Sequence, residues 1–182
     1  MGLWRVFYAD WQMECCGTPF SVGDEVTWPL LLDEGGETLG GGWSGAIAEI
    51  TATAEHVRDD GAEMRVLRAD DGLVVALSAD PGDGAASDGA DGDGTWPGPG
   101  RRVTRSGLLT VERHGARWPE TTGTVRTIHL VRQDFAEIAP GSRTREPVPA
   151  SRSSEAVDRC PKWFGGGGVG VLAELHVPGP HP

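Results

Sequence analysis

Short runs with a period of two, bounded by glycine, aspartate or proline, constrain this chain more than any other feature. The first of them is residues 3–8 (LWRVFY). A period of two indicates a β-strand, because successive side chains of a strand point to opposite faces of the sheet. Residues 45–57 also fit helical spacing, but their β-branched side chains favour a strand. We expect seven or eight strands, at residues 3–8, 25–30, 45–57, 63–68, 73–77, 108–112, 124–132 and 169–177.

Two stretches are poor in large aliphatic residues. Residues 80–102 contain no Leu, Ile, Val or Phe and are rich in Asp and Gly, so we expect a disordered acidic insert. Its Asp-Gly repeats do not fit a calcium loop, because counting from Asp91 puts Thr95 at the fifth position and Arg102 at the twelfth, where an EF-hand has Glu. Residues 140–162 indicate a linker with one short helical turn at 154–159.

These stretches divide the chain into five predicted parts. They are an N-terminal β unit (1–79), the acidic insert (80–102), a second β unit (103–139), the linker (140–162), and a Gly hinge with the final strand and tail (163–182). The order Phe-x-Val-Gly-Asp-x-Val at 20–26 followed by Gly-x-Ile-x-x-Ile at 45–50 resembles the opening of SH3-like small β-barrels. The fold class we expect is therefore mainly β, with one or two SH3-like or related barrel units, a resemblance that bears on fold rather than function.

The charge of the chain argues against one class of partner. Sixteen Lys and Arg stand against 27 Asp and Glu, a formal net charge of −11. A nucleic-acid-binding surface needs Lys and Arg to replace phosphate counterions, so we do not expect a nucleic-acid partner. The sequence contains no apolar run long enough to cross a membrane, and three cysteines make no disulfide framework. We also expect no signal peptide, because Arg5 interrupts the short apolar start. We expect a cytoplasmic protein with reduced thiols.

Residues 11–28 (WQMECCGTPFSVGDEVTW) combine Cys-Cys-Gly with Pro-Phe and Val-Gly-Asp. This stretch resembles the N-terminus of a family of bacterial proteins of unknown function from GC-rich genomes. Residue usage fits such an origin, because Lys occurs once, Asn is absent, and residues with GC-rich codons are abundant. The resemblance implies no activity and no catalytic residue, and it directs attention to the cysteine pair.

Cys15 and Cys16 leave four interpretations open: metal ligands, a vicinal disulfide, a reactive thiol, or packed small residues. Adjacent side chains of an extended chain point to opposite faces, which disfavours their meeting at one zinc ion. A nucleophilic thiol needs a neighbouring base, and the five histidines form no motif with Cys15. We therefore expect a strand or tight turn with one thiol packed inward and the other reachable by solvent. No cofactor is predicted, and zinc stays an alternative.

Seven tryptophans are available to build a core or to line a pocket. The sequence carries no Gly-x-Ser-x-Gly elbow and no phosphate loop, and we assign no catalytic residue. We predict a non-catalytic interaction or ligand-binding module, with an unidentified protein or small-molecule partner. The alternative is a small enzyme with a Trp- and Cys-lined pocket, or a thiol or metal site at Cys15 and Cys16. The candidate ligand-binding residues are Asp10, Trp11, Glu14, Trp28 and Trp43.

Overall fold

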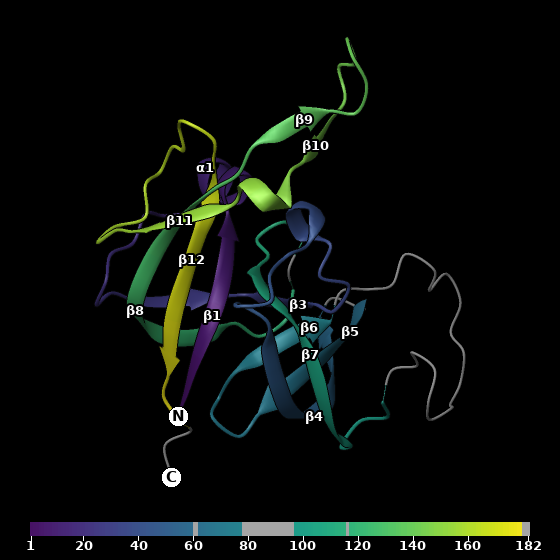
Figure 1. The fold of residues 1–182 in the computed structure, drawn as a ribbon. Helices are drawn as coiled ribbons and strands as arrows, with labels where there is room; N and C mark the ends of the chain where they lie inside the picture. Colours follow the sequence, from purple (N-terminus) through teal and green to yellow (C-terminus); the bar gives the residue numbers. More distant parts are fainter. Residues whose placement is uncertain (60–61, 78–96, 116, 180–182) are drawn as a thin grey trace.

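The computed structural model describes residues 1–59, 62–77, 97–115 and 117–179. These residues form a mainly β structure (Figure 1), which confirms the predicted fold class at that level. The helical elements are α1 (Asp10–Cys16) and the 3-10 turns η1 (Thr38–Gly40) and η2 (Pro149–Ser151). The strands are β1 (Gly2–Ala9), β2 (Glu25–Trp28), β3 (Leu30–Asp33), β4 (Ala48–Asp59), β5 (Ala62–Ala69), β6 (Val74–Leu77), β7 (Arg102–Val111), β8 (Thr121–Arg132), β9 (Phe135–Glu137), β10 (Arg145–Pro147), β11 (Ser153–Ala156) and β12 (Gly168–Val177).

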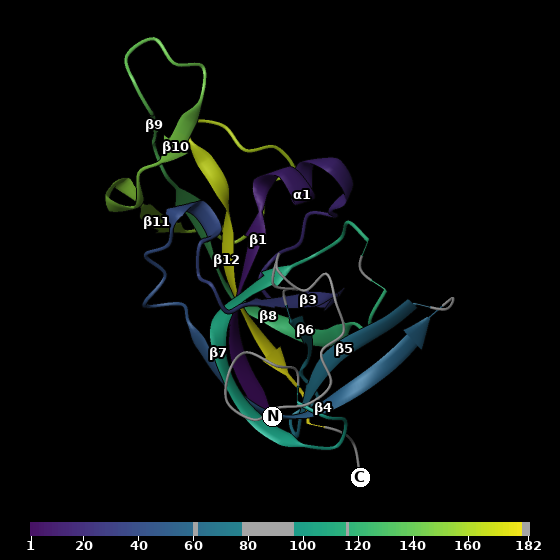
Figure 2. The same ribbon diagram turned by 90° about the vertical axis from the view of Figure 1, so that its right-hand side faces the viewer.

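Ten of these strands belong to one mixed sheet in the order β11-β8-β12-β1-β7-β3-β6-β5-β4, with β2 paired to β8. An additional pairing between β7 and β4 closes β4, β5, β6, β3 and β7 into a ring. Figure 2 shows this ring beside the strands β8, β12 and β1. Strands from the predicted units 1–79 and 103–139 therefore pair with each other, and β7 lies between β1 and β3.

The main core joins the inward faces of the ring and of β1, β8 and β12. Tyr8, Phe20 and Trp28 meet at its centre: the ring centroids of Tyr8 and Trp28 are 5.6 Å apart and those of Phe20 and Trp28 are 4.9 Å apart, both edge to face. Such aromatic pairs contribute about 0.5–1.5 kcal/mol each beyond their buried area. Trp28 therefore serves the core.

The predicted insert and linker differ in how far the structure describes them. Residues 78–96 of the insert region lie outside the described residues, and Arg102 already begins β7. Within the linker a short helical turn occurs as η2 at Pro149–Ser151, whereas residues 154–156, where we expected it, belong to strand β11. The reason is pairing, because Ser153–Ala156 join the free edge of β8. In the described part of the chain, no helix has the length and hydropathy needed to cross a bilayer.

Candidate functional site

Helix α1 follows directly on strand β1, where we expected an extended strand or a tight turn, so that expectation is wrong. A helix of seven residues is too short to be stable alone and depends on tertiary contacts. The Nζ atom of Lys162 donates hydrogen bonds to the carbonyl oxygens of Met13 (2.7 Å) and Gly17 (2.9 Å) at the C-terminal end of α1. A cation is favourable at this end because the helix dipole is negative there.

The helical geometry changes what the cysteine pair can do. Successive residues of an α-helix are rotated by about 100°, not the 180° of a strand. Cys15 and Cys16 are both exposed, whereas Cys160 is buried. The expectation that one thiol of the pair packs inward is therefore wrong. Both thiols of the helix can therefore approach one metal ion, which the extended chain that we expected would not allow.

A parallel strand pair brings a third residue to this helix. Strands β1 and β7 run parallel, with Val6 opposite Leu109, so their carboxyl ends lie at the same edge of the sheet. Helix α1 continues from β1 at this edge, and residues 112–114 continue from β7. This arrangement places His114 beside α1, although it stands 99 residues from Cys15 along the chain.

Gln12 fixes the helix to the end of β7. Its side chain is 4% exposed. The Nε2 atom donates to the carbonyl oxygen of Val111 (2.8 Å), and the Oε1 atom accepts from the backbone N–H of Arg113 (2.6 Å). Both polar atoms of the amide are thereby satisfied, as a buried polar group requires. Gln12 thus holds the backbone beside His114 at a set distance from the cysteines.

Cys15, Cys16 and His114 bring their donor atoms together. The three atoms lie within 4.8 Å of one another, and the Sγ of Cys15 is 3.5 Å from the Nε2 of His114. In tetrahedral zinc coordination, with Zn–S of about 2.3 Å and Zn–N of about 2.0–2.1 Å, a sulfur and a nitrogen ligand are about 3.5–3.6 Å apart. Trp11 stacks on the imidazole of His114 with centroids 5.0 Å apart. Among the described residues, this is the group of His, Cys, Asp or Glu donors that could hold a metal ion.

Charges around the cluster act on Cys16 and Tyr8. Partial removal from water, together with the hydrogen bond and charge of Cys15, raises the pKa of Cys16, while the charges of Arg113 and Lys162 oppose the rise. The Nε of Arg113 donates to the hydroxyl of Tyr8 at 2.9 Å. Burial raises the pKa of Tyr8 even though Arg113 works in the other direction.

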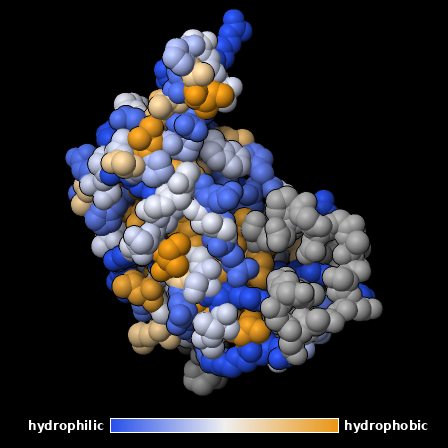
Figure 3. Space-filling view, turned by 45° about the vertical axis from the view of Figure 1, so that its right-hand side comes forward, coloured by the Kyte–Doolittle hydropathy of each residue, from blue (hydrophilic) through white to orange (hydrophobic). Residues whose placement is uncertain are grey.

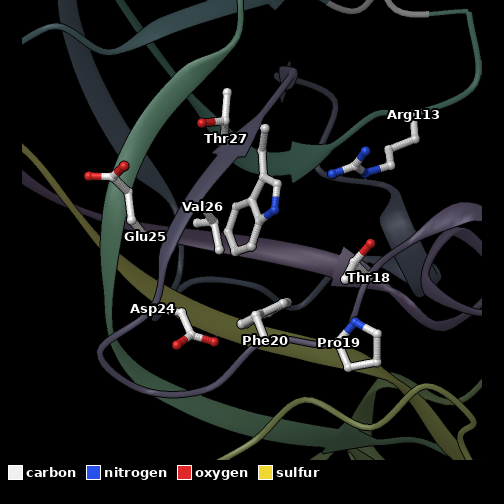
Figure 4. Close-up of a pocket in the computed structure, with 9 residues that line it drawn as sticks. Thr18, Pro19, Phe20, Asp24, Glu25, Val26, Thr27 and Arg113 are labelled. Atoms are coloured by element: carbon white, nitrogen blue, oxygen red, sulfur yellow. The ribbon is translucent and has the colours of Figure 1, made fainter.

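A pocket of about 310 Å³ adjoins this corner of the molecule. It is lined by residues 18–20 and 24–28 and by Arg113. Figure 4 shows the guanidinium group of Arg113 directed into the pocket between Thr27 and Thr18, with Asp24 and Glu25 on the far side. Arg113 precedes His114, and Thr18 stands two residues after Cys16, so the pocket and the metal-ligand candidates share one part of the backbone.

The five candidate ligand-binding residues lie in three places. Asp10, Trp11 and Glu14 are on α1, where Glu14 accepts a hydrogen bond from the backbone of Phe164 (2.9 Å). Burial raises the pKa of Asp10, against the hydrogen bond it accepts from the backbone of Trp11. Trp28 lies in the core and contributes to the lining of the pocket.

Trp43 belongs to a separate packing cluster. Its ring centroid is 4.8 Å from that of Phe7, its indole N–H donates to the carbonyl oxygen of Thr38 (2.7 Å), and the guanidinium of Arg152 lies 3.9 Å from the ring centroid. The structure therefore brings the α1 candidates together with the cysteines but keeps Trp43 apart from them.

Gln12, Arg113 and His114 were not among the residues predicted from the sequence. The predicted strand at 108–112 ends just before Arg113 and His114, and the predicted strand at 3–8 ends just before the cysteine stretch. A parallel pairing of these two strands would have brought the residues together. The period of two indicates where strands lie but not which strands pair. The sequence alone therefore did not predict that these residues would meet.

The comparisons with known proteins give one match. Neither the curated proteins nor the solved structures gave a match to this chain. A family model does match residues 2–177, which include every described strand and all three donors of the cluster. On this match the chain belongs to a family of unknown function, DUF6578.

Proposed function

We propose that the protein is a non-catalytic ligand-binding module whose ligand is a thiophilic metal ion, held by Cys15, Cys16 and His114. The observation that carries the proposal is the convergence of the three donor atoms within 4.8 Å. Thiolate and imidazole are the ligands that Zn²⁺ and Cu(I) favour in proteins. The chain contains 27 Asp and Glu, so a chance cluster of possible metal ligands would be expected to consist of carboxylates. The cluster among the described residues consists instead of two thiols and an imidazole.

The surroundings of the cluster support a preorganised site. Gln12 ties α1 to the end of β7, and the ring of Trp11 restricts the imidazole of His114 on one face. Residues that hold metal ligands in place reduce the ordering entropy lost on binding. The cluster also lies at the surface, since all three donors are exposed, so an ion can enter without unfolding.

Binding of another protein has less support on the face shown in Figure 3. There, apolar residues occur as separate spots among polar ones. A stable protein interface usually has a contiguous apolar centre.

One observation favours a second function. The 3.5 Å separation of Cys15 Sγ from His114 Nε2 also suits a thiol nucleophile with its base. A nucleophile of this kind needs Cys15 and His114 but not Cys16, whereas a metal ion uses all three. Substitution of Cys16 therefore separates the two functions.

The test is titration of the reduced protein with Co²⁺, whose thiolate charge-transfer and d–d absorption report sulfur ligation and tetrahedral geometry. We expect one equivalent to bind. Cys15→Ser, Cys16→Ser and His114→Gln should each weaken binding about tenfold or more, which corresponds to about 1.4 kcal/mol. Competition with Zn²⁺ then gives the zinc affinity.

Two matched variants serve as controls for these substitutions. His56→Gln alters an exposed histidine on β4, and Cys160→Ala alters the buried thiol, so both should leave the cobalt spectrum unchanged. Absence of cobalt binding by the reduced wild-type protein would refute the proposal. Full cobalt binding by Cys16→Ser would show that Cys16 is not a ligand and would contradict the three-donor site, whereas a reactive Cys15 in a protein that binds no cobalt would favour the thiol–imidazole pair.

A further inference from the structure

The metal site proposed above supplies three donors, whereas zinc and cobalt in such sites take four. The neighbouring carboxylates have other partners: Glu14 accepts from the backbone of Phe164, and Glu112 accepts from the backbone of His114. Within the described residues, the converging group consists of Cys15, Cys16 and His114. Because all three are exposed, the fourth position of a bound ion is open to a ligand from solution.

Two cations lie close to the cluster in a chain with a net charge of −11. Arg113 immediately precedes the donor His114, and Lys162 contacts the end of α1 that carries both cysteines. Lys162 already donates to two helix carbonyls. Arg113 donates through Nε to Tyr8, and the described residues offer no further partner for its guanidinium. Its two terminal nitrogens are therefore suited to an anionic ligand.

Arg113 also lines the pocket of about 310 Å³ shown in Figure 4. This volume lies at the lower end of the range of small-molecule sites, about 300–1,000 Å³. The guanidinium is directed into the pocket, while the next residue, His114, contributes to the metal cluster. The three donors do not line this pocket, but the Tyr8 hydroxyl that accepts from Arg113 lies against Gly17, the residue after Cys16. A small molecule bound to the ion can thus reach Arg113 at the edge of the pocket.

We infer that the fourth position of the ion takes a small anionic thiol, whose sulfur binds the ion and whose carboxylate pairs with Arg113. The inference rests on the proposed metal site. Thiolate suits a thiophilic ion, and the planar guanidinium suits a carboxylate. Binding is a ligand substitution: the thiol releases its proton to solvent, its sulfur forms a bond to the ion, and the water at the fourth position leaves. No atom changes its oxidation state.

The test compares two thiols of equal length on the cobalt-loaded protein: 3-mercaptopropionate and its neutral analogue 3-mercaptopropanol. A ternary complex adds thiolate-to-cobalt absorption beyond that of the two protein thiols. We expect 3-mercaptopropionate to bind about tenfold more tightly or better, the effect of one charge-assisted pair. In Arg113→Met this ratio should fall to near one, and in Arg113→Lys it should stay intermediate. Arg126→Met, an exposed arginine on β8, is the matched control and should keep the wild-type ratio.

The ratio is measured on each variant after loading, so it does not depend on how tightly that variant binds cobalt. Far-ultraviolet circular dichroism checks that Arg113→Met is folded, and Arg113→Lys gives a second reading that keeps the charge. Equal binding of the two thiols, or removal of cobalt without a ternary spectrum, would overturn this inference alone. Failure of cobalt to bind at the loading step would overturn the proposed function as well.

Discussion

Cys160 lies in the core with no exposed surface, and its backbone N–H donates to the carbonyl oxygen of Phe20 at 2.8 Å. Burial raises the pKa of its thiol from 9.0 to about 12. The thiol therefore stays protonated, and unreactive as a nucleophile, at neutral pH. Cys15 and Cys16 are exposed and open to reagents. The surroundings of each cysteine, rather than its residue type, decide which chemistry is open to it.

Cys160→Ala tests the effect of this burial on stability. A group with a raised folded-state pKa stabilises the fold below its unfolded pKa, and this contribution is lost as pH rises toward the folded value. Between about pH 8 and pH 10.5, the wild-type protein should lose about 2 kcal/mol more of its free energy of unfolding than Cys160→Ala loses. Urea unfolding at several pH values measures the difference. Parallel pH dependence of the two proteins would show that Cys160 ionises freely when folded.

From the sequence we expected one buried thiol, which is correct, but we assigned it to the wrong cysteine. Free cysteine is often buried, and we expected the buried thiol to be Cys15 or Cys16, whereas it is Cys160. The error arose because an alternating strand would turn one of two adjacent residues inward. A short helix whose outer surface carries both thiols has no such alternation. The position of the third donor, His114, beside the cysteines depends on the parallel pairing of β1 and β7, which the local sequence does not encode.

At the scale of elements, strands were predictable and α1 was not. Residues 3–8, 63–68 and 73–77 carry the period of two, and each overlaps a strand. Asp70-Asp71-Gly72 forms the turn between β5 and β6, with Gly72 at φ 91°. Helix α1 has only two turns and no side-chain N-cap, so its local signal is weak. Its stability comes from partners far away along the chain, chiefly Gln12's contacts with β7 and the contacts of residues 162–164.

Lys162→Met measures how much of the stability of α1 comes from those distant partners. Methionine keeps an unbranched apolar stem but cannot donate to the carbonyl oxygens of Met13 and Gly17. We expect the free energy of unfolding to fall by about 1–3 kcal/mol, as for loss of hydrogen bonds that involve a charged group. Amide exchange in residues 10–17 should also accelerate. Arg145→Met, on the exposed hairpin strand β10, should change stability by less than about 0.5 kcal/mol.

At the scale of the molecule, the last strand lies between the first strand and β8. Strand β12 pairs with β1 from Gly2 opposite Val177 to Ala9 opposite Gly170, and it pairs with β8 on its other side. The hairpin of β9 and β10, by contrast, forms a separate two-stranded sheet that projects from the body (Figure 1). Pairing between residues so far apart in sequence depends on how all the strands pack together, and not on the local sequence of any one strand. This is why the predicted strands did not reveal the topology.

Two deletions should therefore have opposite outcomes. Removal of β12 leaves β1 and β8 without their shared partner, and we expect no cooperative thermal transition. Replacement of residues 136–146 by Gly-Gly shortens the hairpin where Phe135 and Pro147 already face each other. This second change should shift the melting temperature by less than about 5 °C. Circular dichroism on heating tests both, and a cooperative transition without β12 would contradict the central place given to that strand.

The register of β1 and β12 also sets a length scale. Gly2 and Val177 face each other at one end of β1, and α1 begins at its other end. Eight residues at about 3.3 Å each separate these two positions from the start of the cysteine helix by about 26 Å. A fluorophore coupled near residue 2 or residue 177 would sit beyond touching distance of the thiols. It would still lie within range of resonance energy transfer to a chromophore there, with nearly the same efficiency from either attachment point.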